Sequence, residues 1–275
     1  MINSNSKDLV SICIPVFNGE NTIRDTLLSA INQTYENIEI VVVDNCSEDN
    51  TVNIVQANMS GHIRLYQNSE NLGMVGNWNK CLEYAKGEYI TILCADDLLN
   101  RDCIEKKVNI MRENKDVVMV FSASEIINEN GTSLMKRRIF NNNKIMEGKK
   151  ISLRSYREKN LFGEPSNVLF RKSALNETGG FDASMYYSAD WDMWLKIANT
   201  GKVGYISEVL MKYRVSKNNQ TSKTKLQTYI KDDSRMMSNI HNNNYMSTKK
   251  VDDCIHRGMF IFRMFARIVY LKVKA

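Results

Sequence analysis

The chain of 275 residues is long enough for one large domain or two smaller ones, and its 43% hydrophobic and 25% charged residues are an ordinary globular balance. The net charge of +6 is modest and dispersed, so charge gives no argument for a nucleic-acid partner. The six cysteines form no C-x-x-C pair and only three histidines accompany them, which argues against a zinc module.

The amino-terminal segment "MINSNSKDLV" is polar, unlike a secretory signal peptide. No uncharged apolar run reaches the roughly 18 residues that a membrane-spanning helix needs. We therefore expect a cytoplasmic protein whose cysteines are reduced.

The first hundred residues alternate between strand-like and helix-like patterns. Apolar runs predict strands at 10–17, 38–44, 63–68 and 87–96, and apolar residues about one helical turn apart predict helices at 20–33, 50–59 and 74–86. This alternation predicts an α/β fold with a mainly parallel, doubly wound sheet flanked by helices.

The rest of the chain is less regular. A helix and a strand are predicted within 101–121, followed by a turn-rich, basic segment at 128–150 that we expect to be a mobile loop. In "SADWDMWLKIANTG" (188–201), Trp191, Trp194 and Leu195 share one helical face, with Asp190 at the start of the helix. We expect two halves of one domain at 8–100 and 101–222, and a helical extension at 223–275.

Two adjacent carboxylates, Asp96 and Asp97, follow the apolar strand at 87–96. Open α/β sheets bind ligands at the carboxyl ends of their strands, and carboxylate oxygens suit Mg²⁺ or Mn²⁺. Such a cation needs only one or two protein carboxylates when a phosphate supplies further oxygens. The alternative is structural, because either aspartate could cap a helix beginning in "LLNRDCIEKK".

Several motifs stand together in one order. The segment "SICIPVFNGENTIRDTLLSAINQTYENIEIVVVDNCSEDNT", followed by "NLGMVGNWNKCLEYAKGEYITILCADD", closely resembles the nucleotide-sugar half of family 2 glycosyltransferases, which have the GT-A fold. "GEPSNVLFRKSAL" and "GGFDASMYYSADWDMWLKIANTGKVGYISEVLMKYR" resemble the acceptor-side region of that family. The resemblance covers roughly residues 8–222 and implies a Rossmann-like, GT-A domain.

The resemblance implies a role for each matching residue. On the donor side, the residues expected to contact nucleotide are Pro15, Val16 and Phe17 along the base and ribose, Glu20 near the ribose, and Asp44 and Asn45 near the base. Asp97 would be the closer metal ligand, and Asp96 would contact the ribose or, through water, the metal. Family members often carry Asp where this chain has Asn45.

On the acceptor side, the resemblance places Asp190 at the position of the catalytic base, with Glu164 and Trp191 nearby. The alternative for Asp190 is again a helix cap, and both roles can hold together. Asp192 competes for the role of base, but it could instead pair with Lys196 one turn away.

One position departs from the family pattern. Many relatives carry a metal-binding His two residues after the Tyr-Arg of "YRVSKNNQTS", and this chain has Ser216 there. Because a hydroxyl is a weaker ligand than an imidazole for Mn²⁺-like ions, the metal would be held mainly by substrate. Arg214 or Lys217 would then be available to contact the diphosphate.

The carboxyl-terminal segment "RGMFIFRMFARIVYLKVKA" combines apolar residues with bases. On a helix, His256, Arg263, Arg267 and Lys274 fall near one stripe. That pattern fits a helix on an anionic membrane surface, and it fits equally a helix that docks on its own domain or on a second subunit.

Together, these features predict an inverting glycosyltransferase that uses Mg²⁺ or Mn²⁺ and a nucleotide-sugar donor, expected to be a UDP-sugar. The acceptor would be lipid-linked or an oligosaccharide, as in the assembly of bacterial surface polysaccharide such as O-antigen or capsule. The resemblance also allows a non-catalytic sugar-nucleotide-binding protein, and a nucleotidyltransferase is a weaker alternative. Asp190 favours glycosyl transfer over both.

Overall fold

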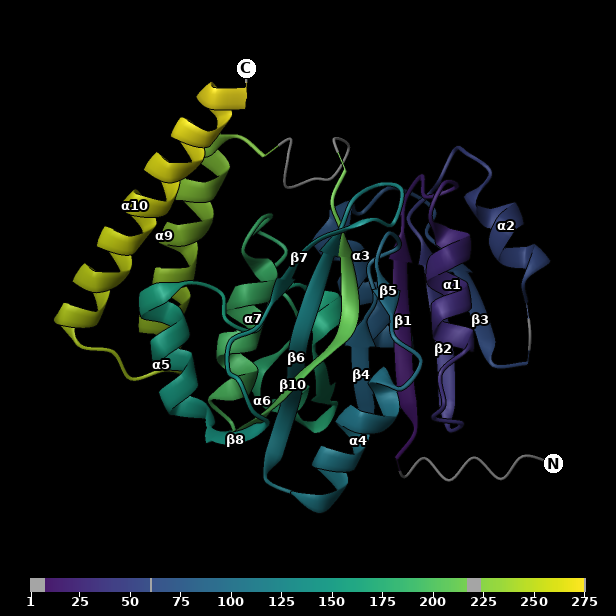
Figure 1. Ribbon diagram of the computed structural model, residues 1–275, viewed down its shortest axis with the longest axis horizontal. Coiled ribbons are helices and arrows are strands. Elements are labelled where there is room, and N and C mark those ends of the chain that lie inside the picture. The colour runs from purple at the N-terminus through teal and green to yellow at the C-terminus, as the bar shows by residue number, and fades with distance from the viewer. Residues whose placement is uncertain (1–7, 60, 217–223, 275) are drawn as a thin grey trace.

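The computed structural model describes residues 8–59, 61–216 and 224–274, the last eight of these without their side chains. Within this part of the chain, ten strands form one sheet, in which eight follow the order β3-β2-β1-β4-β9-β6-β10-β5, while β7 pairs with β6 and β8 with β10 (Figure 1). The strands are β1 (Val10–Val16), β2 (Ile38–Asp44), β3 (Ile63–Gln67), β4 (Tyr89–Ile92), β5 (Leu98–Leu99), β6 (Val117–Ile127), β7 (Ser133–Arg137), β8 (Lys144–Glu147), β9 (Leu169–Arg171) and β10 (Lys202–Arg214).

The sheet is parallel where the sequence alternates between strand and helix, and mixed beyond that point. β1 pairs in parallel with β2 and β4, and β2 with β3. β9 then runs antiparallel to both β4 and β6, while β6 and β10 pair in parallel over most of their length. The two expected halves of the chain therefore contribute strands to the same sheet.

Helices cover both faces of the sheet. One face carries α1 (Ile23–Ile31), α2 (Thr51–Ala57) and α4 (Cys103–Glu113). The other carries α3 (Gly73–Tyr84), α5 (Gly148–Glu158), α7 (Ala189–Ala198) and α9 (Leu226–Asn243). Short helices α6 (Ser173–Thr178) and the 3-10 turn η1 (Pro165–Asn167) flank β9, and α10 (Lys250–Lys274) ends the described chain.

The alternation of side chains along β1 shows why both faces must be covered. Ile12 and Ile14 point into the core beneath α1, whereas Cys13 between them points into the core beneath α3. All three side chains are fully buried, which explains the continuous apolar run that parallel strands display.

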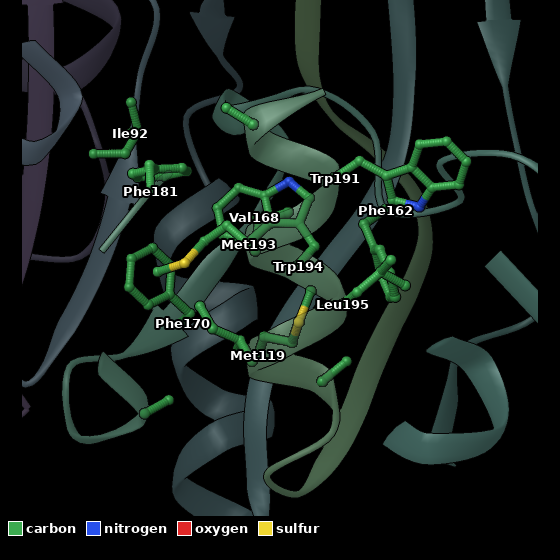
Figure 2. Packing of buried hydrophobic residues seen from close by; sticks show 14 of the residues in the cluster. Ile92, Met119, Phe162, Val168, Phe170, Phe181, Trp191, Met193, Trp194 and Leu195 are labelled. Atoms are coloured by element: carbon green, nitrogen blue, oxygen red, sulfur yellow. The ribbon is translucent and has the colours of Figure 1, made fainter. Parts of the chain in front are cut away.

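Helix α7 lies at the centre of the core on the face of the sheet that also carries α3, α5 and α9. We expected one apolar face, but every residue of α7 is buried except Asp190, which is half-buried. Figure 2 shows Trp194 among Phe170 and Phe181, and the ring centroids lie 5.7 and 5.8 Å from that of Trp194. Because its surroundings are packed on all sides, α7 is a firm support for the residues at its amino end.

The segment 128–150, expected to be a mobile loop, instead contains β7, β8 and the start of α5. That expectation was wrong because both strands are defined by their partners and not by local apolar alternation. β7 folds back on β6 after a turn in which the Gly131 N–H donates to the Asn128 carbonyl oxygen, and β8 runs antiparallel to the distant β10. Most of their side chains are exposed, so the sequence carries no strand period there.

The carboxyl-terminal helices pack against the domain. Met236, Met237 and Ile240 of α9 belong to the same core as α7, and α10 lies along α5. None of the described helices is both long enough and apolar enough to cross a membrane.

The bases that fall near one stripe of α10 face inward where the structure describes them, as in the docking alternative. His256 is fully buried, with Nδ1 2.7 Å from the Tyr156 carbonyl oxygen and Nε2 2.8 Å from a carboxylate oxygen of Asp233. Arg263 lies over the ring of Trp191, with its guanidinium carbon 5.5 Å from the ring centroid. The side chains of Arg267 and Lys274 lie outside the described residues. Helix α10 therefore docks on its own domain through His256 and Arg263.

Candidate active site

Asp96 and Asp97 lie on a turn beyond the end of β4, which stops at Ile92, earlier than the predicted strand end. The turn is closed by the Asp97 N–H, which donates to the Cys94 carbonyl oxygen at 3.0 Å. The Thr26 hydroxyl of α1 lies 2.9 Å from the carbonyl oxygens of both Ala95 and Asp97. Helix α1 thus holds the two aspartates at the carboxyl edge of the sheet.

The capping alternative for this pair is wrong, because the following helix α4 begins at Cys103 with Asp102 as its N-cap. Asp97 is instead fully buried, and its carboxylate accepts hydrogen bonds from the Ser166 hydroxyl at 2.6 Å and from the Arg214 backbone N–H at 3.0 Å. The pair is therefore held in place by β10 and η1 as well as by its own turn.

Both aspartates have a raised pKa, so each is harder to ionise than an exposed aspartate. Burial and then the charge of Asp96 raise the pKa of Asp97 well above its usual range, although the bonds from Ser166 and Arg214 act in the opposite direction. Burial also raises the pKa of Asp96. Two desolvated like charges are costly, and a bound cation is the usual way in which proteins relieve such a pair.

The side chains at this site can be compared with those that the metal implied by the family resemblance would need as ligands. Among the described residues, no group of three or more His, Cys, Asp or Glu side chains is arranged to hold a metal ion. Asp96 and Asp97 nonetheless fit a cation that takes its remaining oxygens from a diphosphate. Ser216 is half-buried just beyond the end of β10, and Lys217 lies outside the described residues.

Asp190 is the second residue of α7, whose N-cap is Ser188, so the capping alternative for Asp190 is also wrong. Burial raises the pKa of Asp190 to about 7, and the charge of Glu164 adds to that rise. The side-chain amide of Asn160 donates to Asp190 Oδ2 at 3.3 Å and acts in the opposite direction. A carboxylate with this pKa is a far better proton acceptor than an exposed aspartate.

The acidic residues of the two halves lie within electrostatic range of one another. The charge of Glu164 raises the pKa of both Asp97 and Asp190. After burial, the charges of Asp97, Asp96 and Asp190 all raise the pKa of the Cys94 thiol. Glu164 itself pairs with Arg137 of β7. The fold therefore brings Asp96, Asp97, Glu164 and Asp190 into one electrostatic cluster.

The expected competitor of Asp190 has a different role. Asp192 is fully buried, and its Oδ2 lies 2.5 Å from Lys196 Nζ, which confirms the predicted pair across one turn. Its Oδ1 accepts a hydrogen bond from the Tyr245 hydroxyl at 2.9 Å. Asp192 thus ties α7 to the segment that joins α9 and α10.

Asp44 and Asn45, at the end of β2, are both buried but differ in their hydrogen bonds. The Asn45 amide is fully engaged within the protein: its nitrogen donates to Asn71 and Gly73, and its oxygen accepts from Asn68 and the Leu72 N–H. Asp44 Oδ2 accepts from the Ser47 N–H, while its buried Oδ1 has no hydrogen-bond partner. An unpartnered buried carboxylate oxygen is ready to accept a donor from a ligand.

The remaining expected donor-side residues lie at the end of β1 and in the loop that follows. Val16 packs into the core, so it can contact a ligand only through its backbone, whereas Phe17 is 45% exposed and Pro15 is half-buried. The Glu20 carboxylate accepts from the Asn50 N–H at 3.1 Å, which ties the loop after β1 to the loop after β2. These two loops form one layer at the carboxyl edge of the sheet.

On the acceptor side, Trp191 is only 8% exposed, and its indole N–H donates to the Ser155 hydroxyl at 2.9 Å. It therefore offers little free surface.

Two contacts were not expected from the sequence: the Ser166 hydroxyl on Asp97 and the Arg214 guanidinium, whose Nε donates to the Asp96 carbonyl oxygen at 2.9 Å. Both bridge residues far apart in the chain, so no local pattern could have revealed them.

Comparison with known proteins identifies relatives of this arrangement. The family model described as glycosyl transferase family 2 matches residues 11–179. An uncharacterized glycosyltransferase of Rickettsia typhi is 34% identical over 220 residues, which are 79% of this chain and 67% of that protein. One from Methanocaldococcus jannaschii is 31% identical over 233 residues, which are 82% of this chain and 78% of that protein. The chain spans only 34% of a Rickettsia felis relative that is 33% identical.

Solved structures share the fold at low sequence identity. A crystal structure of S. aureus TarS residues 1–349 in complex with UDP-GlcNAc has a TM-score of 0.73 and 19% identity, covering 91% of this chain and 71% of that one. The mannosyltransferase PcManGT from Pyrobaculum calidifontis, in complex with GDP-Man and Mn²⁺, has a TM-score of 0.62 and 19% identity, covering 91% and 69%. The expected GT-A fold is confirmed, and the chain belongs to glycosyl transferase family 2.

Proposed function

We propose that this glycosyltransferase moves a sugar from a nucleotide-sugar donor to an acceptor hydroxyl with inversion, and that Asp190 is the general base. The observation that carries the proposal is the Asp190 carboxylate, whose pKa is raised to about 7 at the start of a buried helix and which lies within electrostatic range of the Asp96–Asp97 turn. A base with its pKa near neutrality suits proton transfer from an alcohol.

In the proposed step one bond forms, one bond breaks and one proton is transferred. The acceptor oxygen forms a bond to the anomeric carbon of the donor, and the bond from that carbon to the diphosphate breaks. The hydroxyl proton passes to the Asp190 carboxylate, and the nucleoside diphosphate leaves with the bonding electron pair. Asp190 also orients the acceptor, because its position on α7 is fixed by the packed core.

Asp96 and Asp97 are proposed to hold Mg²⁺ or Mn²⁺ together with the donor diphosphate. When bound there, the cation would neutralise charge on the departing diphosphate. The two carboxylates gain from this arrangement as well, since the cation offsets the mutual repulsion and desolvation that raise the pKa of each.

The donor is proposed to be a UDP-sugar. The unpartnered Oδ1 of Asp44 supports this, because uracil presents an N–H donor on its pairing edge. The TarS structure contains UDP-GlcNAc, whereas PcManGT contains GDP-Man, and guanine also carries N–H donors. Testing both donors therefore distinguishes the two bases.

The acceptor is proposed to be lipid-linked or an oligosaccharide, in the assembly of a bacterial surface polysaccharide, with the protein at the cytoplasmic face of the membrane. The support lies in α10, whose outward face carries Ile261, Phe262 and Phe265 at 67%, 64% and 66% exposure. The exposed Arg257 lies beside them. An apolar helical face with an adjacent base suits the surface of an anionic membrane.

The test is release of nucleoside diphosphate from a panel of UDP- and GDP-sugars, with Mn²⁺, with Mg²⁺, or with a chelator. We expect turnover of a UDP-sugar that stops in chelator and in Asp97→Asn. Calorimetry gives a second readout, since Mn²⁺ should tighten UDP binding to the wild type and not to Asp97→Asn. Nucleotide binding without any turnover would instead identify a non-catalytic binding protein.

A further inference from the structure

Helix α9 lies against the segment that leads into α7. The Asp232 side chain of α9 is 1% exposed, and its Oδ2 accepts hydrogen bonds from three consecutive backbone N–H groups. The donors are Tyr186 at 2.9 Å, Tyr187 at 2.5 Å and Ser188 at 3.0 Å. Ser188 is the N-cap of α7, and Asp190 follows two residues later.

The Asp232 carboxylate provides a helix cap that no side chain at the start of α7 provides. The Ser188 side chain makes no capping hydrogen bond, so α7 has no side-chain cap of its own. A charged acceptor at the amino end of a helix both satisfies backbone donors and interacts favourably with the helix dipole. Asp232 therefore acts as a cap that comes from an element more than forty residues later in the chain.

Other contacts from α9 hold the same segment on either side. Asp182 accepts hydrogen bonds from Arg235 Nε at 2.9 Å and from the Asn239 amide at 3.0 Å. The same amide lies 3.3 Å from Asp192 Oδ1, within α7. Helix α9 thus fixes the chain before and after Asp190.

From this geometry we propose that Asp232 is a positioning residue for sugar transfer: it fixes the start of α7 and, through it, the Asp190 carboxylate. The inference rests on the proposed role of Asp190 as the base. It extends the active unit beyond the family match, which ends at residue 179, to the carboxyl-terminal helices.

The size of the expected effect follows from the geometry that a general base requires. The base must lie within hydrogen-bond reach of the hydroxyl, and a displacement of about 1 Å can cost roughly 10²-fold in rate. We expect Asp232→Ala to lower turnover by roughly 10- to 100-fold. The affinity for UDP should hardly change, because Asp44 ends β2 and Asp97 lies on the turn after β4, both away from α9.

The experiment measures nucleoside diphosphate release and UDP affinity for the wild type, Asp232→Ala and Asp232→Asn. The matched control is Asp233→Asn on the same helix, since Asp233 binds His256 of α10 and is also buried. We expect the control to retain the turnover of the wild type per folded molecule. Equal losses in the control and in Asp232→Ala would contradict a specific role for Asp232.

A double variant decides whether Asp232 acts through Asp190. Once Asp190→Asn has removed the base, adding Asp232→Ala should cause no further loss of turnover. Losses that multiply would overturn the proposal. If Asp232→Ala does not fold, Asp232→Asn is used in the same comparisons, with a smaller loss of turnover expected because its amide oxygen keeps a neutral acceptor at the same place.

The two proposals fail in different ways. A fully active Asp190→Asn would refute the proposed base itself. An inactive Asp190→Asn beside a fully active Asp232→Ala, with its fold intact, would leave the base in place and refute only the positioning role.

Discussion

Asp190 is an aspartate whose surroundings change its chemistry. An exposed aspartate has a pKa of about 3.9 and is a weak base for an alcohol. Burial at the start of α7, together with the charge of Glu164, raises the pKa of Asp190 to about 7. The residue type could be read from the sequence, but its strength as a base could not, because that strength depends on packing around it.

This shift predicts a pH dependence. The base is active only when deprotonated, so kcat/KM for the donor should rise with pH through a midpoint near 7 and level off above it. Turnover measured between pH 5 and 9 at saturating metal checks this. In Asp190→Asn the residual rate should lose that midpoint, and a wild-type profile that is flat down to pH 5 would contradict the assigned environment of Asp190.

Helix α10 shows how an element can be predicted correctly while its orientation is not. The sequence indicates a basic stripe and apolar residues on the rest of the helix. It does not decide whether the helix binds a membrane surface or packs against protein. The structure turns His256 toward Asp233 and Arg263 toward Trp191, and Ile261, Phe262 and Phe265 point outward. The orientation depends on a carboxylate and a ring from distant elements, which no helical period can supply.

The outward apolar face of α10 gives a test of the proposed contact with a membrane. Replacing Phe262 and Phe265 with serine should abolish binding to anionic lipid vesicles, because their apolar surface would enter the boundary of the acyl chains. Vesicle flotation at two salt concentrations measures this. The control, Leu134→Ser, replaces a similarly exposed apolar residue on β7 and should bind as the wild type does. Unaltered binding of the double variant would exclude the apolar face of α10 as the contact.

The strands, like α10, could be predicted where the local sequence defines them and not where distant partners do. β1 and β2 could be placed from apolar runs, because parallel strands that are buried on both faces consist mainly of consecutive apolar residues. β7 and β8 could not, since their side chains are mainly exposed and their partners are distant or across a turn. β4 was predicted too long because the apolar run continues past Ile92 through Leu93, which is buried although it lies outside the strand.

At the scale of the whole molecule, the site is assembled by one sheet. β4 leads to Asp96 and Asp97, and β10 returns to place the Arg214 N–H on Asp97. The core of the other face supports α7 and hence Asp190. The motifs could be identified separately from the sequence, but their closeness is a property of the strand order, in which β9 and β6 separate β4 from β10.

The central claim is that donor binding and proton removal belong to different parts of this molecule. The most direct test compares Asp190→Asn with the wild type in two measurements, UDP affinity by calorimetry and release of nucleoside diphosphate from a UDP-sugar. The variant should fold, and at pH 8 it should be at least as stable as the wild type. The reason is that a folded-state pKa raised to about 7 means that the Asp190 carboxylate costs stability progressively as pH rises from about 4 to about 7.

We predict that Asp190→Asn binds UDP with unchanged affinity and turns over roughly 10²- to 10⁴-fold more slowly, as expected for the loss of a general base. Asp116→Asn, an exposed carboxylate that pairs with Lys202, serves as the control and should match the wild type in both measurements. Turnover of Asp190→Asn at the wild-type rate, with UDP affinity intact, would contradict the account.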